Sequence, residues 1–203
     1  MRTSRPTILL TAALVATTAL SVGLIGCSAT DSLSEQYQQG SERSESADGR
    51  IVEIPVAERG AAVSFAGTTE YGDPVSSDDY AGQVYVVNFW YAACGPCIIE
   101  APMLEEVWQS YQDEGVGFLG VNIYDQPATA VAFAEENGIT YPSVIDVNDG
   151  RVKQAFAGVT PIQATPTTLV LDREGRVAAR IIGQLESASI LDTLVADALA
   201  ETP

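Results

Sequence analysis

The sequence contains no histidine, and this absence excludes several kinds of catalytic site. Neither a Ser-His-Asp triad nor a Cys-His pair can be built without an imidazole ring. Basic residues are also few, because 10 Lys and Arg stand against 27 Asp and Glu and leave a formal net charge of −17. Such a charge repels nucleic-acid phosphates, so we expect no nucleic-acid partner. Its simplest role is to keep the protein soluble.

Cysteine is scarce as well, with only three residues, which is too few for a disulfide scaffold. Cys27 follows a long apolar run, whereas Cys94 and Cys97 form a close pair far downstream. The sequence therefore offers one candidate modification site and one candidate redox pair. A length of 203 residues suits one domain with extensions, and 46% hydrophobic residues exclude a wholly disordered chain.

The first residues have the pattern of a secretion signal. Arg2 and Arg5 precede a stretch from Thr7 to Ile25 in which every residue is apolar or small, and the next charged residue is Asp31. The alternative is an uncleaved transmembrane anchor, because about 20 apolar residues span a bilayer. The richness in Thr, Ala and Ser favours a cleaved signal. Either segment would hold the rest of the chain outside the cytoplasm.

The end of this stretch, Leu24-Ile25-Gly26-Cys27, resembles the lipobox of bacterial lipoproteins. The resemblance implies a signal peptide over residues 1–26 and a lipid on Cys27, which becomes the first mature residue and anchors the chain to the membrane. Residues 27–60 are mostly Ser, Glu, Gln, Gly and Asp, so we expect them to form a flexible tether.

Residues 61–203 have the periodicity of a folded domain. The near-continuous apolar run 84–90 predicts a strand that is buried on both faces. The other predicted strands are 63–66 and 75–80, which form a hairpin, then 116–123, 143–146, 167–171 and 177–183, and the predicted helices are 96–114, 128–137 and 187–200. This order predicts an α/β domain whose mixed central sheet has helices on both faces and an N-terminal β-hairpin extension.

The Cys94-Gly95-Pro96-Cys97 motif has three possible chemistries: a zinc site, a structural disulfide or a redox pair. Structural zinc needs four ligands, and a disulfide that closes so short a loop adds little stability. The redox interpretation is favoured because the pair follows a buried strand and begins a helix, whose N-terminus stabilises a thiolate. Cys94 would be the exposed nucleophile and Cys97 the resolving thiol. We expect neither a metal nor another cofactor.

The segment from Asn88 to Pro102 resembles the active-site segment of the TlpA/ResA-like thioredoxins, as do residues 72–75, 80–84 and 165–172. The resemblance implies a thioredoxin fold and thiol–disulfide exchange. The resemblance also implies that Pro166 is a cis-proline that faces the disulfide; the alternative is an ordinary trans proline. A cis bond there would expose the Thr165 backbone to an extended substrate. Trp90, Gly95 and Pro96 are the remaining predicted substrate-binding residues.

Glu100 matches the acidic residue that this family carries three positions after the second cysteine. It would either accept a proton from Cys97 or be a solvated acid in the first turn of the helix. The chain departs from the family at Ala93, where tryptophan is usual, and at Ile98 and Ile99, where a basic residue is common. Asn88 stands where cytosolic thioredoxins carry a buried aspartate.

The resemblance implies a monomeric, extracytoplasmic reductant of disulfides in exported proteins, such as apocytochrome c. Its electrons would come from a membrane thiol donor of the CcdA/DsbD kind. Alternatives are a disulfide-forming oxidase or isomerase and a non-catalytic lipoprotein that binds a partner through its acidic face. A peroxiredoxin is disfavoured because Tyr91 stands where its reactive-cysteine motif has Thr or Ser.

Overall fold

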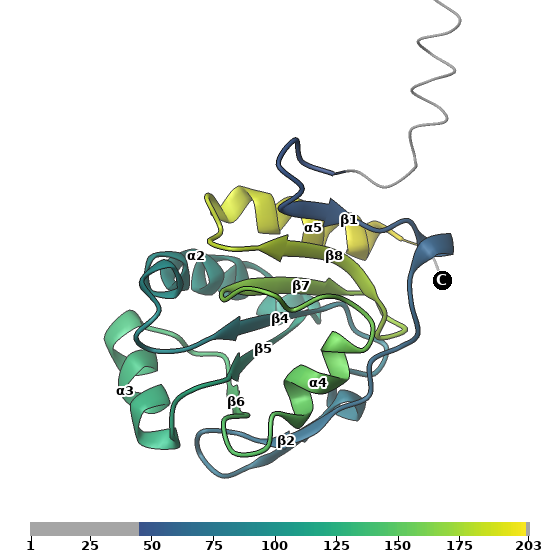
Figure 1. Ribbon diagram of the computed structural model, residues 1–203. Coiled ribbons are helices and arrows are strands. Elements are labelled where there is room, and N and C mark those ends of the chain that lie inside the picture. Colours follow the sequence, from purple (N-terminus) through teal and green to yellow (C-terminus); the bar gives the residue numbers. More distant parts are fainter. Residues whose placement is uncertain (1–44, 202–203) are drawn as a thin grey trace, which may run out of the picture. The chain divides into compact units, whose positions relative to one another are not determined.

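The computed structural model describes residues 45–201, so the predicted signal peptide, the predicted lipidation site Cys27 and the rest of segment 1–44 lie outside the described residues (Figure 1). The strands are β1 (Ile51–Glu53), β2 (Ala66–Thr68), β3 (Pro74–Ser76), β4 (Tyr85–Trp90), β5 (Gly117–Asn122), β6 (Ser143–Ile145), β7 (Thr167–Leu171) and β8 (Val177–Ile182). The α-helices are α2 (Gly95–Tyr111), α3 (Pro127–Asn137), α4 (Arg151–Ala157) and α5 (Ala188–Ala200). Short 3₁₀ helices span Val56–Glu58, Ser77–Tyr80 and Gln112–Glu114.

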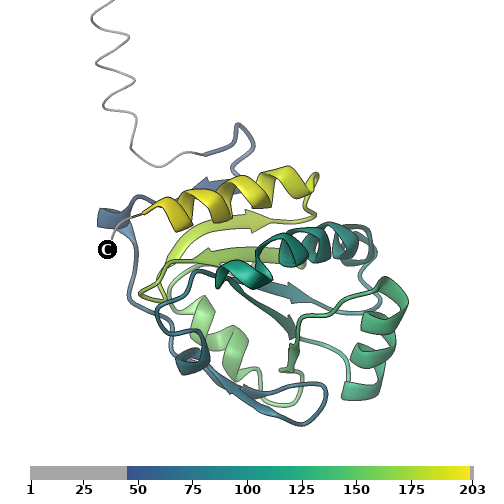
Figure 2. The same cartoon turned by 180° about the vertical axis from the view of Figure 1, so that it is seen from behind.

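The main sheet has the strand order β1-β8-β7-β4-β5-β6, and β2 and β3 form a separate hairpin. Strands β4, β5 and β6 are parallel, whereas β7 is antiparallel to β4, and β8 is antiparallel to both β7 and β1. Helices α2, α3 and α5 cover one face, and α4 covers the other together with the β2–β3 hairpin (Figures 1 and 2). The predicted mixed α/β fold with helices on both faces is confirmed.

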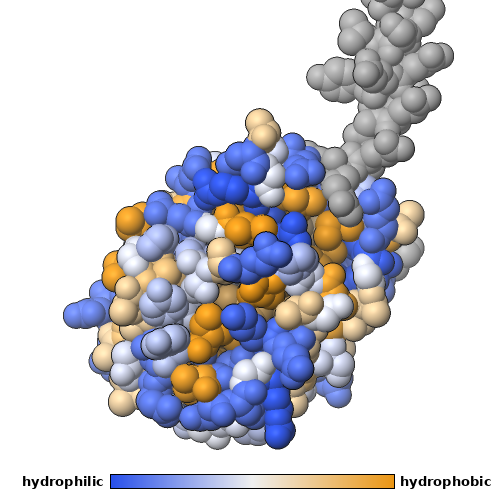
Figure 3. Space-filling view, in the orientation of Figure 1, coloured by the Kyte–Doolittle hydropathy of each residue, from blue (hydrophilic) through white to orange (hydrophobic). Residues whose placement is uncertain are grey.

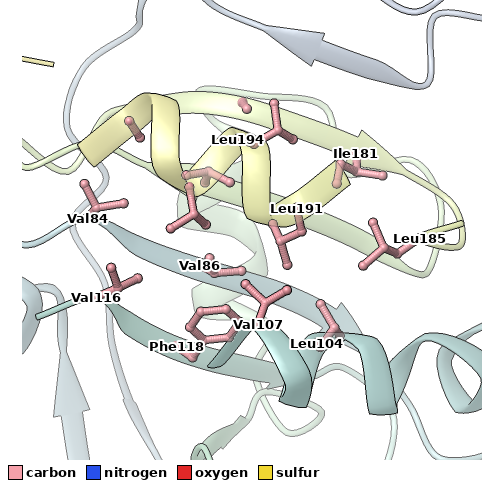
Figure 4. Packing of buried hydrophobic residues seen from close by; sticks show 14 of the residues in the cluster. Val84, Val86, Leu104, Val107, Val116, Phe118, Ile181, Leu185, Leu191 and Leu194 are labelled. Carbon is pink, nitrogen blue, oxygen red and sulfur yellow. The ribbon is translucent and has the colours of Figure 1, made fainter. Parts of the chain in front are cut away.

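Strands β4 and β5 form the centre of the sheet, and every side chain in them is buried. Alternate residues of β4 point to opposite faces because side chains alternate along a strand. Val86 therefore packs with α2 and α5, whereas Val87 packs on the side of α4. Figure 4 shows the first of these layers, in which Leu104 and Val107 of α2 and Leu191 and Leu194 of α5 converge on the sheet.

Helix α4 is absent from the sequence-based predictions because its capping signal is not local. It begins after Gly150, whose left-handed backbone (φ 66°) suits glycine. The first-turn N–H groups of Val152 and Lys153 donate to the two carboxylate oxygens of Asp146, at 2.8 and 2.9 Å. A carboxylate that lies several residues upstream thus performs the role of an N-cap.

The predicted boundary between tether and domain at residue 60 is wrong. Strand β1 lies inside the predicted tether and pairs antiparallel with β8. Arg50 anchors this strand, because its guanidinium donates to the carbonyl oxygens of Ile182 at 3.1 Å and Gln184 at 2.7 Å. The run Ile51-Val52-Glu53-Ile54 has the β-branched residues that a strand favours, but it is short and follows a long polar stretch, so its pairing with β8 was not recognised from the sequence.

In the orientation of Figure 1, apolar patches are scattered among hydrophilic residues (Figure 3). Within residues 45–201, no helix combines the length and the apolar character that crossing a bilayer requires.

Candidate active site

The cysteine pair lies where the central strand β4 meets helix α2. The backbone N–H of Cys94 donates to the Tyr91 carbonyl oxygen at 3.2 Å, which closes the turn after the strand. Cys94 is the N-cap of α2, and its Sγ accepts from the Cys97 N–H at 3.2 Å. The two cysteines form a disulfide. Both sulfurs therefore lie at the positive end of the helix dipole, which stabilises a thiolate after reduction.

The disulfide is shielded on most sides. Cys94 is only 3% exposed, so the prediction of an exposed nucleophile is wrong for the disulfide form. Tyr91 and Ala92 pack against the buried cluster that contains both cysteines, which accounts for the shielding. The neighbouring Gly95 and Pro96, both predicted to bind substrate, lie exposed on the first turn of α2.

The loop before β7 faces the cysteine pair. The Thr165–Pro166 peptide bond is cis, as the resemblance implied. The Sγ atom of Cys94 lies 3.9 Å from the carbonyl oxygen of Thr165. The backbone of Thr165 thus lies beside the sulfur, while its contact with a substrate stays a prediction.

Trp90 does not lie on the accessible rim. It is 6% exposed, its ring centroid lies 4.4 Å from that of Phe133 in α3, and its indole N–H donates to the Ser143 Oγ at 3.2 Å. The predicted role of Trp90 in substrate binding therefore has no support from the geometry. The residue packs beneath the disulfide and links α3 to the sheet.

Glu100 is completely buried, which overturns the alternative of a solvated first-turn acid. Its Oε1 accepts from the Asn88 side-chain amide and its Oε2 from the Leu185 backbone N–H, both at 2.8 Å. Burial raises the pKa of Glu100 to about 7, and these two hydrogen bonds oppose the rise only in part. The carboxyl group therefore exchanges a proton near neutral pH, one helical turn after Cys97.

A second loop at the same edge was missed by the sequence-based reasoning. Because β4 and β5 are parallel and Trp90 pairs with Asn122, the segments that follow these strands lie side by side. The carboxylate Oδ2 of Asp125 accepts from the Ala92 N–H at 2.6 Å and from the Asn122 amide at 2.9 Å. An acidic residue directly after a buried strand, at the edge that also carries the cysteines, was the available signal.

Within the described residues, no three cysteine, aspartate or glutamate side chains are grouped so that they could hold a metal ion.

Comparison with known proteins assigns the family. The AhpC/TSA family model matches residues 59–180. Among curated relatives, the thiol–disulfide oxidoreductase ResA of Geobacillus thermodenitrificans is 38% identical over 112 residues, which span 55% of this chain and 62% of the relative. ResA of Geobacillus kaustophilus is 35% identical over 135 residues, which span 66% of this chain and 75% of the relative.

Solved structures agree. A DsbF homologue from Corynebacterium diphtheriae superposes with a TM-score of 0.66 at 30% identity and covers 76% of this chain and 98% of its own. A secreted thiol–disulfide isomerase from Corynebacterium glutamicum has a TM-score of 0.66 at 28% identity, with 77% and 96% covered. With its Cys94–Cys97 disulfide at a helix N-terminus, the chain belongs to the AhpC/TSA family, among the ResA-type thiol–disulfide oxidoreductases of the thioredoxin fold.

Proposed function

We propose that this protein is an extracytoplasmic reductant, tethered to the membrane through lipid-modified Cys27, that reduces disulfides in exported proteins. The observation that carries the proposal is the Cys94–Cys97 disulfide at the N-terminus of α2, opposite the cis Thr165–Pro166 bond. Apocytochrome c, whose cysteines must be reduced, is a candidate client. A membrane thiol donor of the CcdA/DsbD kind regenerates the dithiol.

The exchange proceeds in two displacements. In the reduced protein, the Cys94 thiolate attacks one sulfur of the client disulfide, so a mixed disulfide forms and one client thiolate leaves. The Cys97 thiolate then attacks the Cys94 sulfur, which restores the internal disulfide and releases the second client thiolate. Two electrons pass from the protein to the client, and a donor dithiol returns them by the reverse sequence.

Cys94 is the attacking sulfur because of its place in the helix. Its Sγ already accepts the Cys97 N–H, and such a bond to an unpaired first-turn donor favours the thiolate. Cys97 lies one turn further in and is likewise buried. Burial does not distinguish the two sulfurs, so the assignment of Cys94 rests on this hydrogen bond and on its place beside the cis-proline loop, 3.9 Å from the Thr165 carbonyl oxygen.

Glu100 serves the second displacement by accepting the Cys97 proton. A pKa of about 7 means that a substantial fraction of the carboxyl groups is ionised at neutral pH, which suits a general base. The amide of Asn88 and the N–H of Leu185 hold the carboxylate in place without adding a positive charge. Proton transfer from Cys97 to Glu100 keeps the exchange within a site that excludes bulk water.

The reduction potential of the Cys94/Cys97 couple tests the direction of transfer. We expect the full chain, equilibrated with a thiol redox buffer, to show a potential near or below about −270 mV, the level of thioredoxin. A value of about −120 to −180 mV, typical of oxidants and isomerases, would contradict a reductant and favour disulfide formation or shuffling. Cys94→Ser should abolish dithiol-dependent reduction of a client disulfide in the same preparation.

A further inference from the structure

Two tyrosines lie side by side at the edge of the sheet that carries the disulfide. Tyr91 follows β4 and Tyr124 follows β5, and their ring centroids are 5.5 Å apart with an interplanar angle of 40°. Tyr124 is 74% exposed. Tyr91 packs on one side against the cluster that contains Cys94. A half-buried and an exposed tyrosine thus form a pair next to the buried cluster that contains Cys94.

The loop that carries Tyr124 is held firmly. The side-chain oxygen of Asn122 accepts from the backbone N–H groups of Tyr124 and Asp125, at 3.1 and 2.7 Å. Asp125 in turn binds the Ala92 N–H, and the Ile123 N–H donates to the Trp90 carbonyl oxygen at 3.1 Å. These bonds connect the loop to the turn that precedes Cys94, so the rings are positioned before any partner arrives.

Small side chains leave the pair open. Ala93, between Tyr91 and Cys94, is exposed and presents only a methyl group beside the disulfide. A partner that engages Cys94 can therefore place a neighbouring side chain on the rings without meeting a bulky residue.

The negative charge around this edge favours a cationic side chain on the partner. Residues 91–137, which run from the turn before Cys94 through α2 and the Tyr124 loop to the end of α3, include no lysine or arginine but eight aspartates and glutamates. The nearest acid in sequence is Asp125, whose Oδ2 is engaged while its Oδ1 accepts no hydrogen bond from the described residues. Aromatic faces attract cations, and these carboxylates add to that attraction.

We propose that Tyr91 and Tyr124 form a recognition surface for a lysine or arginine side chain close to the reactive cysteine of the client. The proposal rests on the thiol–disulfide exchange described above and specifies its preferred substrates as basic cysteine-containing segments. The cation stacks on the exposed ring of Tyr124 while the client sulfur meets Cys94. Asp125 is a positioning residue, because it holds the loop and the turn together.

Two disulfide-linked peptide dimers that differ only in charge test this preference. One carries arginine two residues from the cysteine, and the other carries citrulline, which has the same shape without the charge. The full chain, reduced beforehand, is mixed with each dimer, and release of peptide thiol is followed. At high salt, where diffuse attraction is screened, we expect the arginine peptide to react about two- to fivefold faster, the factor for an exposed cation–aromatic contact.

Substitutions locate the source of the preference. Tyr124→Leu should bring the ratio of the two rates close to one, whereas Tyr124→Phe should retain it, because a phenylalanine ring also attracts a cation. Tyr71→Leu is the matched control, because Tyr71 is also exposed (66%) but lies on the turn between β2 and β3. This substitution should leave the ratio of the two rates unchanged. A ratio that Tyr124→Leu leaves unchanged, or a ratio of one in the unsubstituted chain, would overturn the proposal.

The two proposals fail in different ways. If neither peptide oxidises the dithiol, thiol–disulfide exchange itself is refuted. If both peptides react at one rate, exchange stands and only recognition by the tyrosines is refuted.

Discussion

The two ends of the sheet each bury a carboxylate, and the two groups have opposite surroundings. Glu100, near the disulfide, receives hydrogen bonds from two neutral donors of the described part of the chain, the Asn88 amide and the Leu185 N–H. Asp172 directly follows β7. The last residue of β7, Leu171, pairs with Tyr85 at the start of β4, whereas Cys94 follows the end of β4, so Asp172 lies far from Cys94. It is equally buried but is bound by the guanidinium groups of Arg59 and Arg176, both at 2.9 Å.

The difference separates an acid that holds the fold together from an acid that can exchange a proton. Asp172 joins three parts of the chain, because Arg59 also pairs with Glu201 after α5 and the N–H groups of Glu174 and Arg176 bind Asp172 Oδ1. Among residues 45–201, Glu100 has no cation paired with its carboxyl group, and burial raises its pKa to about 7. The ion pairs of Asp172 thus tie segments of the chain together, whereas the carboxyl group of Glu100 stays able to exchange a proton.

Asp172→Ala should have the largest effect on stability. The substitution leaves the almost fully buried guanidinium of Arg59 without one of its two carboxylate partners. Removing one partner of a buried ion pair costs about 3–5 kcal/mol of stability. Urea unfolding measures the loss. The rate of disulfide reduction under native conditions should not change, and a rate that fell as steeply as the stability would contradict the separation of the two ends.

The pH dependence of stability isolates Glu100. In the unfolded chain its pKa is near 4.5, and in the folded chain it is about 7, so between these values the native state holds a proton that the unfolded state has released. The contribution is fully present below pH 4.5, and the free energy of unfolding falls as the pH rises toward 7, by at most about 1.4 kcal/mol per unit.

Glu100→Gln should remove this fall of the unfolding free energy with pH. Urea unfolding of the variant and of the unsubstituted chain at several pH values across the same range measures the difference. Equal slopes in the two proteins would show that the carboxyl group is not the proton-binding site. The same substitution should slow the release of client from the mixed disulfide if Glu100 accepts the Cys97 proton.

This contrast marks what the sequence could and could not predict. The apolar run of β4 and the helical spacing of α2 identified the strand, the helix and the cysteines between them, because both signals are local. The spacing of Glu100 from Cys97 was equally plain. Its burial was not, because it depends on the segment around Leu185, 85 residues away, closing over the carboxylate.

Other misses have the same physical origin. Strand β1 exists because of its pairing with β8 and the contacts of Arg50, and helix α4 begins at a carboxylate outside its own first turn. Trp90 was assigned to the substrate from the family resemblance alone. Alternation along β4 already placed it on the side of Asn88, toward α2 and away from solvent.

Asp125→Ala should have an intermediate effect. It leaves the partly buried N–H of Ala92 without its acceptor, which costs about 1–3 kcal/mol. Thermal unfolding measures this, with Gln126→Ala as the control on the neighbouring exposed residue. A loss no larger than that of the control would show that Asp125 does not hold the Tyr124 loop against the turn before Cys94.

Arg151→Ala should have the smallest effect and gives the reference for Asp172. Its pair with Asp149 spans 3.2 Å, but the arginine side chain is 79% exposed, and such pairs contribute about 0–1 kcal/mol. The midpoint of urea unfolding should shift only slightly. A loss comparable to that of Asp172→Ala would show that burial does not distinguish the two ion pairs.

The most direct test of the account is to trap the mixed disulfide and identify the sulfur that carries the client. With a disulfide-bonded peptide as client, Cys97→Ser should accumulate a stable adduct on Cys94, detected by mass spectrometry, because no second thiol remains to resolve it. Cys94→Ser should form no comparable adduct, because the Cys94 sulfur, and not that of Cys97, is the N-cap of α2 beside Thr165, where the proposal places the client. Accumulation on Cys97 instead, or on neither cysteine, would contradict the assignment of Cys94 as the attacking sulfur.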